Sequence, residues 1–213
     1  MDVLQAISDR RSINFFDPSK TVPDETLRAV LETANLAPSS MNLQPWRVVI
    51  VNTPERKTVL RQCAFNQPKV EEASATLIMI ADPACVEANQ DRALQSWVEL
   101  GYVKPEALET YRGMIAGLYG APENLKRTIF AVKNTSLYAM NLMIAARGFG
   151  LETHPMDGFD EPAVKREFGI PEHCIVPMLI AVGYLKPGVT LLPRAFRREL
   201  NEFVRLNDFT SRF

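Results

Sequence analysis

The residues best suited to hold a polar ligand lie between two prolines in the stretch 37–46. Proline disfavours helical geometry in the residue before it, so Pro38 should end the preceding helix. The stiff loop that follows carries hydroxyl and amide groups that donate and accept hydrogen bonds. These groups belong to Ser39, Ser40, Asn42 and Gln44. The same residue types form ordinary turns, and this stretch alone does not separate the two interpretations.

Basic side chains near the N-terminus have the chemistry of a phosphate site. Arg10 and Arg11 are adjacent, and Ser12 and Asn14 follow closely. Guanidinium groups make paired, charge-assisted hydrogen bonds to phosphate oxygens, and a hydroxyl and an amide can satisfy the remaining acceptors. A solvated basic turn at a helix end is the plain alternative.

A second group of arginines stands at 194–198, in a C-terminal segment that also carries an apolar stripe. The stripe consists of Leu200, Phe203, Val204 and Leu206. Because so many apolar side chains favour packing over free solvation, we expect the segment 186–213 to be an arm. We expect it to wrap a partner subunit and to bring its arginines to a shared site.

Two further segments offer groups of the same kind. Asn66 and Lys69 place an amide and an ammonium just before a predicted buried strand, where a solvated lysine is the common alternative. Farther on, a tight loop includes Gly158, which would let a backbone approach a flat ligand closely.

Several kinds of site are missing from the sequence. No glycine-rich dinucleotide fingerprint, phosphate-binding P-loop or nucleophile elbow is present, so a nicotinamide cofactor would not be held in a Rossmann crevice. The two histidines, His154 and His173, have no companion carboxylate motif and are expected to be structural. The three cysteines have no metal-ligand spacing, so we expect no metal site and a reducing compartment.

Composition narrows the class of protein. The 213 residues are 46% hydrophobic and 23% charged, with a net charge of −1, which is typical of one globular domain. This charge gives no general attraction to nucleic acid or to an anionic membrane. No apolar stretch is long enough to cross a bilayer, and the first residues lack a secretory signal. We therefore expect a cytoplasmic protein without nucleic-acid or membrane partners.

The elements that must position these groups follow from apolar spacing. The helix that begins near Pro23 buries one face, because apolar residues recur at 27, 30, 31 and 34. Continuous apolar runs predict strands at 47–51, buried on both faces, and at 75–81. A short strand before the loop at 155–159 and an apolar strand at 174–184 complete the prediction.

Two helical regions affect the expected assembly. The segment 82–126 predicts a helical excursion from the single domain, either a lid over a pocket or a purely packing element. The helix 129–147 is apolar around most of its circumference and should be buried on all sides. A second subunit would supply the missing cover, so we expect a homodimer built on this helix.

The segments 10–14, 38–46, 66–69 and 155–160, in this chain order and together with the closing arginines, resemble the nitroreductase family of FMN-dependent oxidoreductases. The resemblance covers nearly the whole chain except 82–126. The most specific matches are Ser-Ser-x-Asn-x-Gln-Pro-Trp at 39–46 and Pro-x-x-Gly-Phe-Asp at 155–160. The resemblance implies an α+β fold with a mostly antiparallel sheet surrounded by helices. It also implies a domain-swapped homodimer that holds one FMN in each of two interface clefts.

The resemblance assigns residues to the flavin position by position. Around the phosphate and pyrimidine edge it implies Arg10, Arg11, Ser12 and Asn14, with Arg194 and Arg197 from the C-terminal segment. From the other subunit it implies Pro38, Ser39, Ser40, Asn42 and Gln44. Against the ring it implies Asn66, Lys69, Pro155, Met156, Asp157 and Gly158. Asn14 stands where many members carry Lys or Arg, and the run 194–198 has extra arginines, so the register of the phosphate contact stays open.

The expected reaction is a ping-pong transfer of hydride from NAD(P)H through N5 of FMN to a nitroaromatic, quinone or similar electron-poor acceptor. No residue is assigned as catalytic, because the flavin carries the chemistry. Enone reduction, reductive dehalogenation and flavin breakdown are alternatives on the same fold. A flavin-binding protein without turnover is an alternative of another class.

Overall fold

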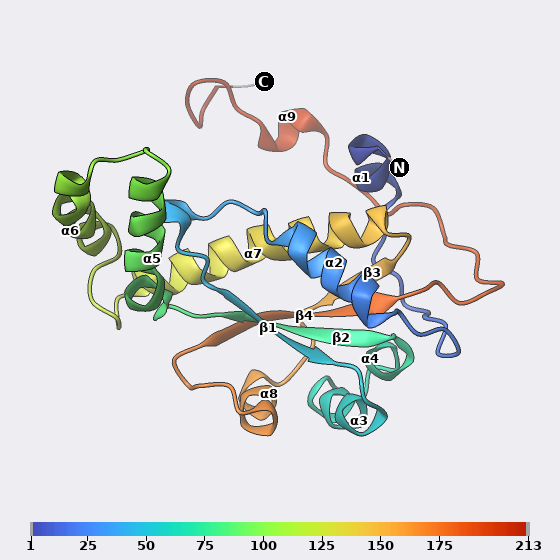
Figure 1. The fold of residues 1–213 in the computed structure, drawn as a ribbon. Helices are drawn as coiled ribbons and strands as arrows, with labels where there is room; N and C mark the ends of the chain where they lie inside the picture. Colours follow the sequence, from blue (N-terminus) through green and yellow to red (C-terminus); the bar gives the residue numbers. More distant parts are fainter. Residues whose placement is uncertain (1, 212–213) are drawn as a thin grey trace.

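A four-stranded antiparallel sheet forms the centre of the computed structural model, which describes residues 2–211 (Figure 1). The spatial order is β1-β2-β4-β3, and each neighbouring pair is antiparallel. The strands are β1 (Trp46–Val51), β2 (Ala75–Ala81), β3 (Glu152–Met156) and β4 (Ile175–Gly183). The predicted α+β class with a mostly antiparallel sheet is confirmed.

The central position of β2 explains its unbroken apolar sequence. Successive side chains of a strand point to opposite faces of the sheet. Leu77 and Met79 pack into a cluster on one face, and Ile78 and Ile80 pack into a second cluster on the other. Every residue of β2 is buried, as predicted for this strand.

One face of the sheet is covered by α2 (Asp24–Ala34) and α7 (Leu125–Gly148), which contact each other (Figure 1). The predicted apolar face of α2 is confirmed, because Leu27, Val30 and Ala34 are buried. The short α1 (Val3–Asp9) contacts α7 as well.

The opposite face is covered by three shorter helices, α3 (Pro54–Cys63), α4 (Lys69–Glu72) and α8 (Glu161–Phe168) (Figure 1). Thr53 caps α3 and Pro54 occupies its first turn, as the sequence predicts. Asp160 caps α8 through the backbone N–H of Ala163. The cap at Asp160 fixes the end of the loop that carries Gly158.

The predicted excursion between β2 and α7 contains two helices, α5 (Cys85–Glu99) and α6 (Leu108–Tyr119), with a 3-10 turn at η2 (Pro105–Ala107) between them. Leu94 and Ile115 join Phe130 of α7 in a hydrophobic cluster of their own. The 3-10 turn η1 (Ser40–Asn42) contacts α5. The excursion therefore packs beside the polar loop at 37–46.

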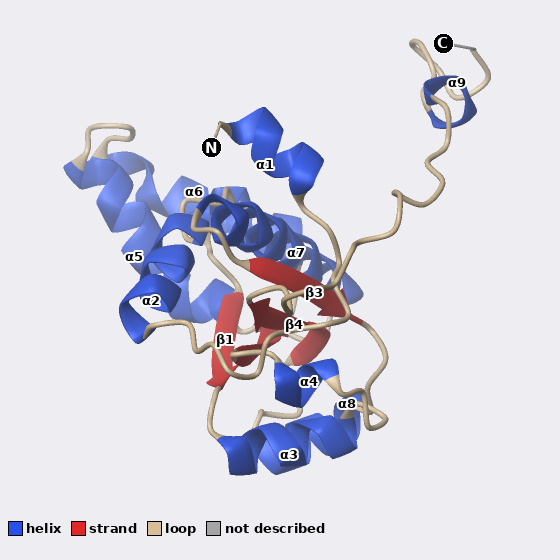
Figure 2. Cartoon of the chain, turned by 90° about the vertical axis from the view of Figure 1, so that its right-hand side faces the viewer, coloured by secondary structure: helices blue, strands red, loops and turns tan. Residues whose placement is uncertain are grey.

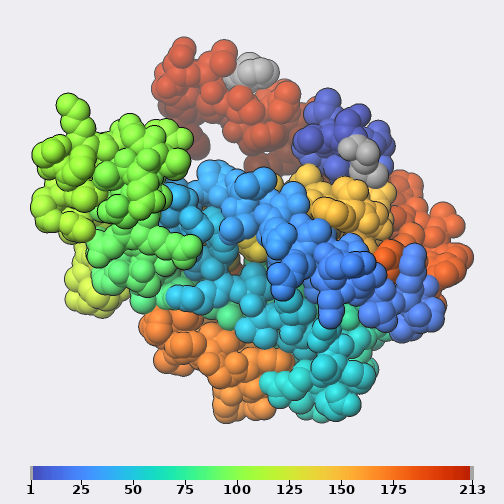
Figure 3. Space-filling view, viewed as in Figure 1, coloured from blue at the N-terminus to red at the C-terminus, as the bar shows by residue number. Residues whose placement is uncertain are grey.

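The C-terminal segment extends away from the sheet. Beyond β4 it contains the single-turn helix α9 (Leu200–Phe203), and Figures 2 and 3 show it apart from the body of the chain. Its apolar residues Phe196, Leu200 and Phe203 are exposed. Within residues 2–211, no helix has the length and apolar character needed to span a bilayer.

One burial prediction is wrong. The strand at 47–51 lies at the edge of the sheet, and Ile50 is 41% exposed, because a continuous apolar run does not distinguish an edge strand from a central one. The long helix α7 keeps an exposed face in the single chain, where a second subunit was expected to supply the cover. Ile129, Leu137 and Met140 remain exposed on one face, at 56%, 45% and 41%.

Candidate functional site

The predicted site residues fall into two separate groups. The first, here called the β3 half-site, surrounds the N-terminal segment, the loop before α4 and the end of β3. Its members are Arg10, Arg11, Ser12, Asn14, Asn66, Lys69, Pro155, Met156, Asp157 and Gly158, with Arg194 and Arg197 of the C-terminal segment at its outer end. The second, here called the loop half-site, is the polar loop before β1. Its members are Pro38, Ser39, Ser40, Asn42 and Gln44.

The N-terminal segment of the β3 half-site runs beside β3. Ser12 forms a parallel bridge with Thr153, and the backbone N–H of Ile13 donates to the Thr153 carbonyl at 3.3 Å. Ile13 is buried while Ser12 and Asn14 are exposed, so alternation along an extended backbone presents both polar side chains outward.

Lys69 is the central cation of the β3 half-site. Its ammonium donates to Asn14 Oδ1 at 2.8 Å and lies 3.2 Å from Nε2 of His154. Burial lowers the pKa of Lys69 below its ordinary value. An ammonium has three N–H donors, so these two partners leave one donor for a ligand. Asn14 and Lys69 line a cavity of about 250 Å³.

Gln67 joins the two loops of the β3 half-site and is a residue that the sequence analysis missed. Its Nε2 donates to the Gly158 carbonyl at 2.7 Å. A Cβ added at Gly158 would lie 3.1 Å from that Nε2, so glycine permits this close approach. The side chain of Met156 is buried in the core, so Met156 can offer a ligand only its backbone.

Four arginines gather at the outer end of the β3 half-site. Arg194 donates to the carbonyls of Ser8 and Arg10, and Arg11 donates to the Leu192 carbonyl at 2.9 Å. The pKa of Arg10 is lowered, most of all by burial, and then by the positive charges of Arg194, Arg197 and Arg11. Such mutual repulsion favours binding of an anion among them.

The arginines of the C-terminal arm contact their own chain. That the arm wraps a partner subunit and brings these arginines to a shared site stays a prediction. In the structure, Arg194 meets Ser8 and Arg10 of its own chain. Arg197 bonds the backbone carbonyls of Ala195 and Phe196 and acts on Arg10 through its charge.

The loop half-site is held by side chains from three helices. Tyr119 of α6 donates to Ser40 Oγ at 2.6 Å, and Asn134 of α7 accepts from the Ser40 N–H at 3.1 Å. Asn89 of α5 donates to the Leu43 carbonyl at 2.9 Å. These three anchors come from distant parts of the chain, and no signal in the loop sequence points to them.

Left-handed backbone marks both half-sites. Among residues 2–211 six non-glycine residues have positive φ, and five of them lie in the two loops. They are Met41, Asn42, Gln44, Phe65 and Asn66, with φ between 45° and 58°. Such conformations cost about 1–3 kcal/mol each and collect at functional sites, where the surrounding structure enforces them.

The two half-sites lie far apart within one chain. Ser40 bonds Asn134, the tenth of the 24 residues of α7, whereas Arg147 near the end of α7 bonds Glu152, the first residue of β3, at 2.5 Å. Thirteen residues separate the two contact points, which at 1.5 Å per residue is about 20 Å along the helix axis. Figure 1 shows η1 and α1 toward opposite ends of α7.

One set of potential metal ligands arises from distant sequence positions, within the part of the chain that the structure describes. Atoms of Asp82, His173 and Cys174 all lie within 4.8 Å of one another. We expected no metal site because the cysteines lack metal-ligand spacing, and this group forms only because the end of β2 and the start of β4 meet in the fold. Arg47 Nε already donates to Asp82 Oδ2 at 2.7 Å, so the carboxylate is paired with a cation.

Comparison with known proteins agrees with this geometry. The model of the Nitroreductase family matches residues 7–184. An NADH dehydrogenase of Thermus thermophilus is 36% identical over 186 residues, which are 86% of this chain and 87% of the relative. A CLA biosynthesis enone reductase from Lactiplantibacillus plantarum is 30% identical, with 85% of each chain covered.

A solved structure supports the same assignment. A protein from Exiguobacterium sibiricum, assigned as a nitroreductase and crystallised in complex with FMN, superposes with a TM-score of 0.86. It is 27% identical, and the match covers 97% of each chain. With the family model spanning most of the sequence, this chain belongs to the nitroreductase family.

Proposed function

We propose that this chain is an FMN-dependent NAD(P)H oxidoreductase that reduces a small electron-poor acceptor, such as a nitroaromatic or a quinone, by a ping-pong mechanism. It acts as a homodimer in which each flavin site combines the β3 half-site of one subunit with the loop half-site of the other. Family membership and the FMN-bound relative support the cofactor and the oxidoreductase class.

The phosphate end of the site fits FMN. A phosphate monoester carries up to two negative charges, and Arg10, Arg11 and Arg194 place guanidinium groups at one end of the β3 half-site. Each charge-assisted hydrogen bond is worth about 1.5–3 kcal/mol. In the absence of an anion these arginines repel one another. A bound phosphate therefore relieves this electrostatic repulsion and also accepts hydrogen bonds.

The ring end also has the required donors. Lys69 keeps one N–H donor free, and Asn66 is exposed on a left-handed turn beside it. A cation near the pyrimidine edge stabilises negative charge on a reduced flavin and raises the reduction potential. Gly158 and Asp157 are exposed on the loop after β3, where backbone N–H groups can meet the ring edge.

FMN, when bound, supplies the electron transfer, taking hydride from NAD(P)H and passing electrons to the acceptor. The residues of the chain bind FMN, orient its ring and adjust its reduction potential. The arginines hold the phosphate, Lys69 and Asn66 hold the ring edge, and the loop half-site covers the ring and ribityl chain. No side chain is assigned as a proton donor.

The observation that carries the two-subunit arrangement is the separation of the half-sites. About 20 Å of helix axis separates the contact of α7 with Ser40 from its contact with the first residue of β3, while the residues assigned to one flavin must all touch a single molecule. The exposed face of α7 between them carries Leu137 and Met140, which a partner subunit would cover. A two-fold axis across α7 would bring the loop half-site of each subunit to the β3 half-site of the other.

Mixed dimers test this proposal directly. One variant, R10Q/R11Q, damages the β3 half-site, and a second variant, N42A/Q44A, damages the loop half-site. Each homodimer should lose FMN. Co-expression with two affinity tags yields the mixed dimer, which has one site built only from intact halves and one site with both halves damaged.

The mixed dimer should therefore bind about one FMN per two chains and recover NAD(P)H oxidation. A mixed dimer as empty as its parents would overturn the composite site. Retention of FMN by both parent variants would overturn the residue assignment. Circular dichroism of each variant verifies that the fold is kept.

Enone reduction is the second candidate, because a 30% identical relative is an enone reductase. Steady-state assays with a nitroaromatic, a quinone and a conjugated enone, run on the same FMN-loaded preparation, rank the acceptors. A kcat/KM for the enone far above the other two would replace the proposed acceptor class.

A further inference from the structure

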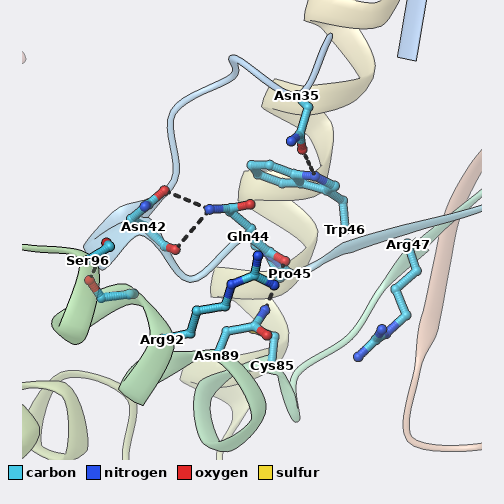
Figure 4. Close-up of a pocket in the computed structure, with 11 residues that line it drawn as sticks. Asn35, Asn42, Gln44, Pro45, Trp46, Arg47, Cys85, Asn89, Arg92 and Ser96 are labelled. Carbon is cyan, nitrogen blue, oxygen red and sulfur yellow. Dashed lines mark hydrogen bonds between the residues drawn. The ribbon is translucent and has the colours of Figure 1, made fainter. Parts of the chain in front are cut away.

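A polar cavity of about 450 Å³ lies between α5, the end of α2 and the loop half-site (Figure 4). Amide and hydroxyl side chains from these three elements line it, among them Asn35, Asn89 and Ser96. Trp46 closes one side, with its indole N–H bonded to Asn35 Oδ1 at 3.0 Å and its ring stacked on Tyr138. The walls are thus rigid and rich in hydrogen-bonding groups.

The charge of this cavity is positive. Its lining includes Arg47 and Arg92 and, among the residues that the structure describes, no carboxylate. Arg47 forms an ion pair with Asp82, with 2.7 Å between Nε and Oδ2. Arg92 makes no ion pair within residues 2–211, and the acidic neighbour Asp91 is instead paired with Arg112 at 2.9 Å. The guanidinium of Arg92 therefore has no carboxylate partner within this described range and can bind an anionic ligand in this cavity.

The cavity is continuous with the proposed flavin site. Asn42 and Gln44 of the loop half-site also line it, and Gln44 Nε2 donates to Asn42 Oδ1 at 3.0 Å. Figure 4 shows Arg92 reaching from α5 toward Pro45 and Gln44. Asn89, one turn before Arg92 on α5, anchors the same loop. A molecule in contact with the loop half-site can therefore place a polar group against Arg92.

We infer that this cavity is a specificity site that binds an anionic oxygen group of a co-substrate through Arg92. The inference rests on the proposed function, which brings NAD(P)H and an acceptor to the loop half-site. A planar guanidinium beside amide donors recognises a phosphate or a carboxylate. Two sources share this chemistry, namely the 2′-phosphate of NADPH and a carboxylate on the acceptor.

The test compares FMN-loaded wild type with Arg92→Gln and with Arg28→Gln, a matched control whose side chain is 79% exposed and lies outside this cavity. The kinetic arm measures kcat/KM for NADPH and for NADH. The binding arm measures the Kd of benzoate and of its uncharged analogue benzamide by calorimetry. Both arms are repeated at high salt, which screens exposed charges.

Arg92→Gln should weaken the charged member of one pair about tenfold, equivalent to about 1.4 kcal/mol, and leave the uncharged member unchanged. High salt should shrink that difference. A loss in the nucleotide pair identifies the 2′-phosphate, and a loss in the benzoate pair identifies an acceptor carboxylate.

Equal losses for charged and uncharged members, no loss in either pair, or the same loss in Arg28→Gln would overturn the inference. The proposed function fails differently, because wild-type protein would then lack FMN or fail to oxidise NAD(P)H. The FMN content and NADH turnover of wild type, measured first, separate the two outcomes.

Discussion

The ammonium of Lys69 lies 3.2 Å from Nε2 of His154, and Nδ1 of the same imidazole lies 2.6 Å from the Ile13 carbonyl oxygen. Because a carbonyl only accepts, Nδ1 carries the proton and Nε2 accepts from Lys69. Burial, and to a lesser extent the charge of Lys69, lowers the pKa of His154. The neutral imidazole thus joins β3 to the N-terminal segment and orients the main cation of the β3 half-site.

Acidification should destabilise the protein through His154. Its pKa is lower in the folded chain than the ordinary value of 6.5, so the unfolded chain binds more protons as pH falls below about 6.5. The free energy of unfolding should therefore decline between pH 7.5 and 5.5. His154→Gln, which does not titrate, should show a shallower decline in urea midpoints of FMN-free protein at fixed concentration.

Wild-type protein, measured at the same urea and protein concentrations, is the control for this titration. Equal slopes for wild type and His154→Gln would show that His154 does not titrate in this range.

Replacing Arg10 should separate stability from cofactor binding. Repulsion by three neighbouring arginines contributes to the lowered pKa of Arg10, so Arg10→Gln should raise the melting temperature of FMN-free protein slightly. The same change should weaken FMN binding by about 1.5–3 kcal/mol, because one charge-assisted bond to phosphate is lost. Thermal melts without flavin and fluorescence titration with FMN measure the two effects.

Riboflavin, which lacks the phosphate, checks the cause of that loss. Its affinity should be the same for wild type and Arg10→Gln, and Arg28→Gln should match wild type with both flavins. A parallel loss of riboflavin binding would place Arg10 elsewhere than at the phosphate.

The predictable part of the site consists of local chemistry. Loops with prolines, amides and adjacent arginines keep the same hydrogen-bonding groups and charges in any fold. Segments such as 39–46 could therefore be identified from sequence. The residues that hold these loops in place could not be predicted from sequence, because they lie far from the loops along the chain. Tyr119 reaches Ser40 from 79 positions away, and His154 reaches Ile13 from 141.

Burial was the less predictable part of the fold. The apolar run of β1 resembles that of β2, yet β2 has two neighbouring strands and β1 has one. The spacing of apolar residues predicts which face of a helix or strand is buried, but not which neighbouring elements cover it. The same reason explains α7, whose apolar face includes Leu137, which is 45% exposed in the part of the chain that the structure describes.

Tyr119 should position Ser40 without touching the flavin directly. Its hydroxyl donates to Ser40 Oγ at 2.6 Å, while its ring packs on Phe130 with centroids 4.4 Å apart. Tyr119→Phe keeps the packing and should cost about 0.5–1.5 kcal/mol of stability from the lost hydrogen bond. FMN affinity should fall severalfold, because the strained loop loses one of three anchors. Tyr102→Phe, at a residue 75% exposed, is the matched control, and unchanged FMN affinity in Tyr119→Phe would remove the positioning role.

The exposed face of α7 should carry the subunit contact. Leu137 is 45% exposed on that face and lies three residues after Asn134, which contacts the loop half-site. A glutamate there would bury a charge against the apolar surface of a partner, which is costly without a compensating pair. Leu137→Glu should therefore give monomers in sedimentation velocity at concentrations where wild type is dimeric, and FMN should be lost together with the dimer. Leu36→Glu, at a residue 83% exposed outside that face, should change neither property. A Leu137→Glu monomer that still binds FMN as tightly as wild type would show that one chain holds the flavin alone, despite the separation of its half-sites.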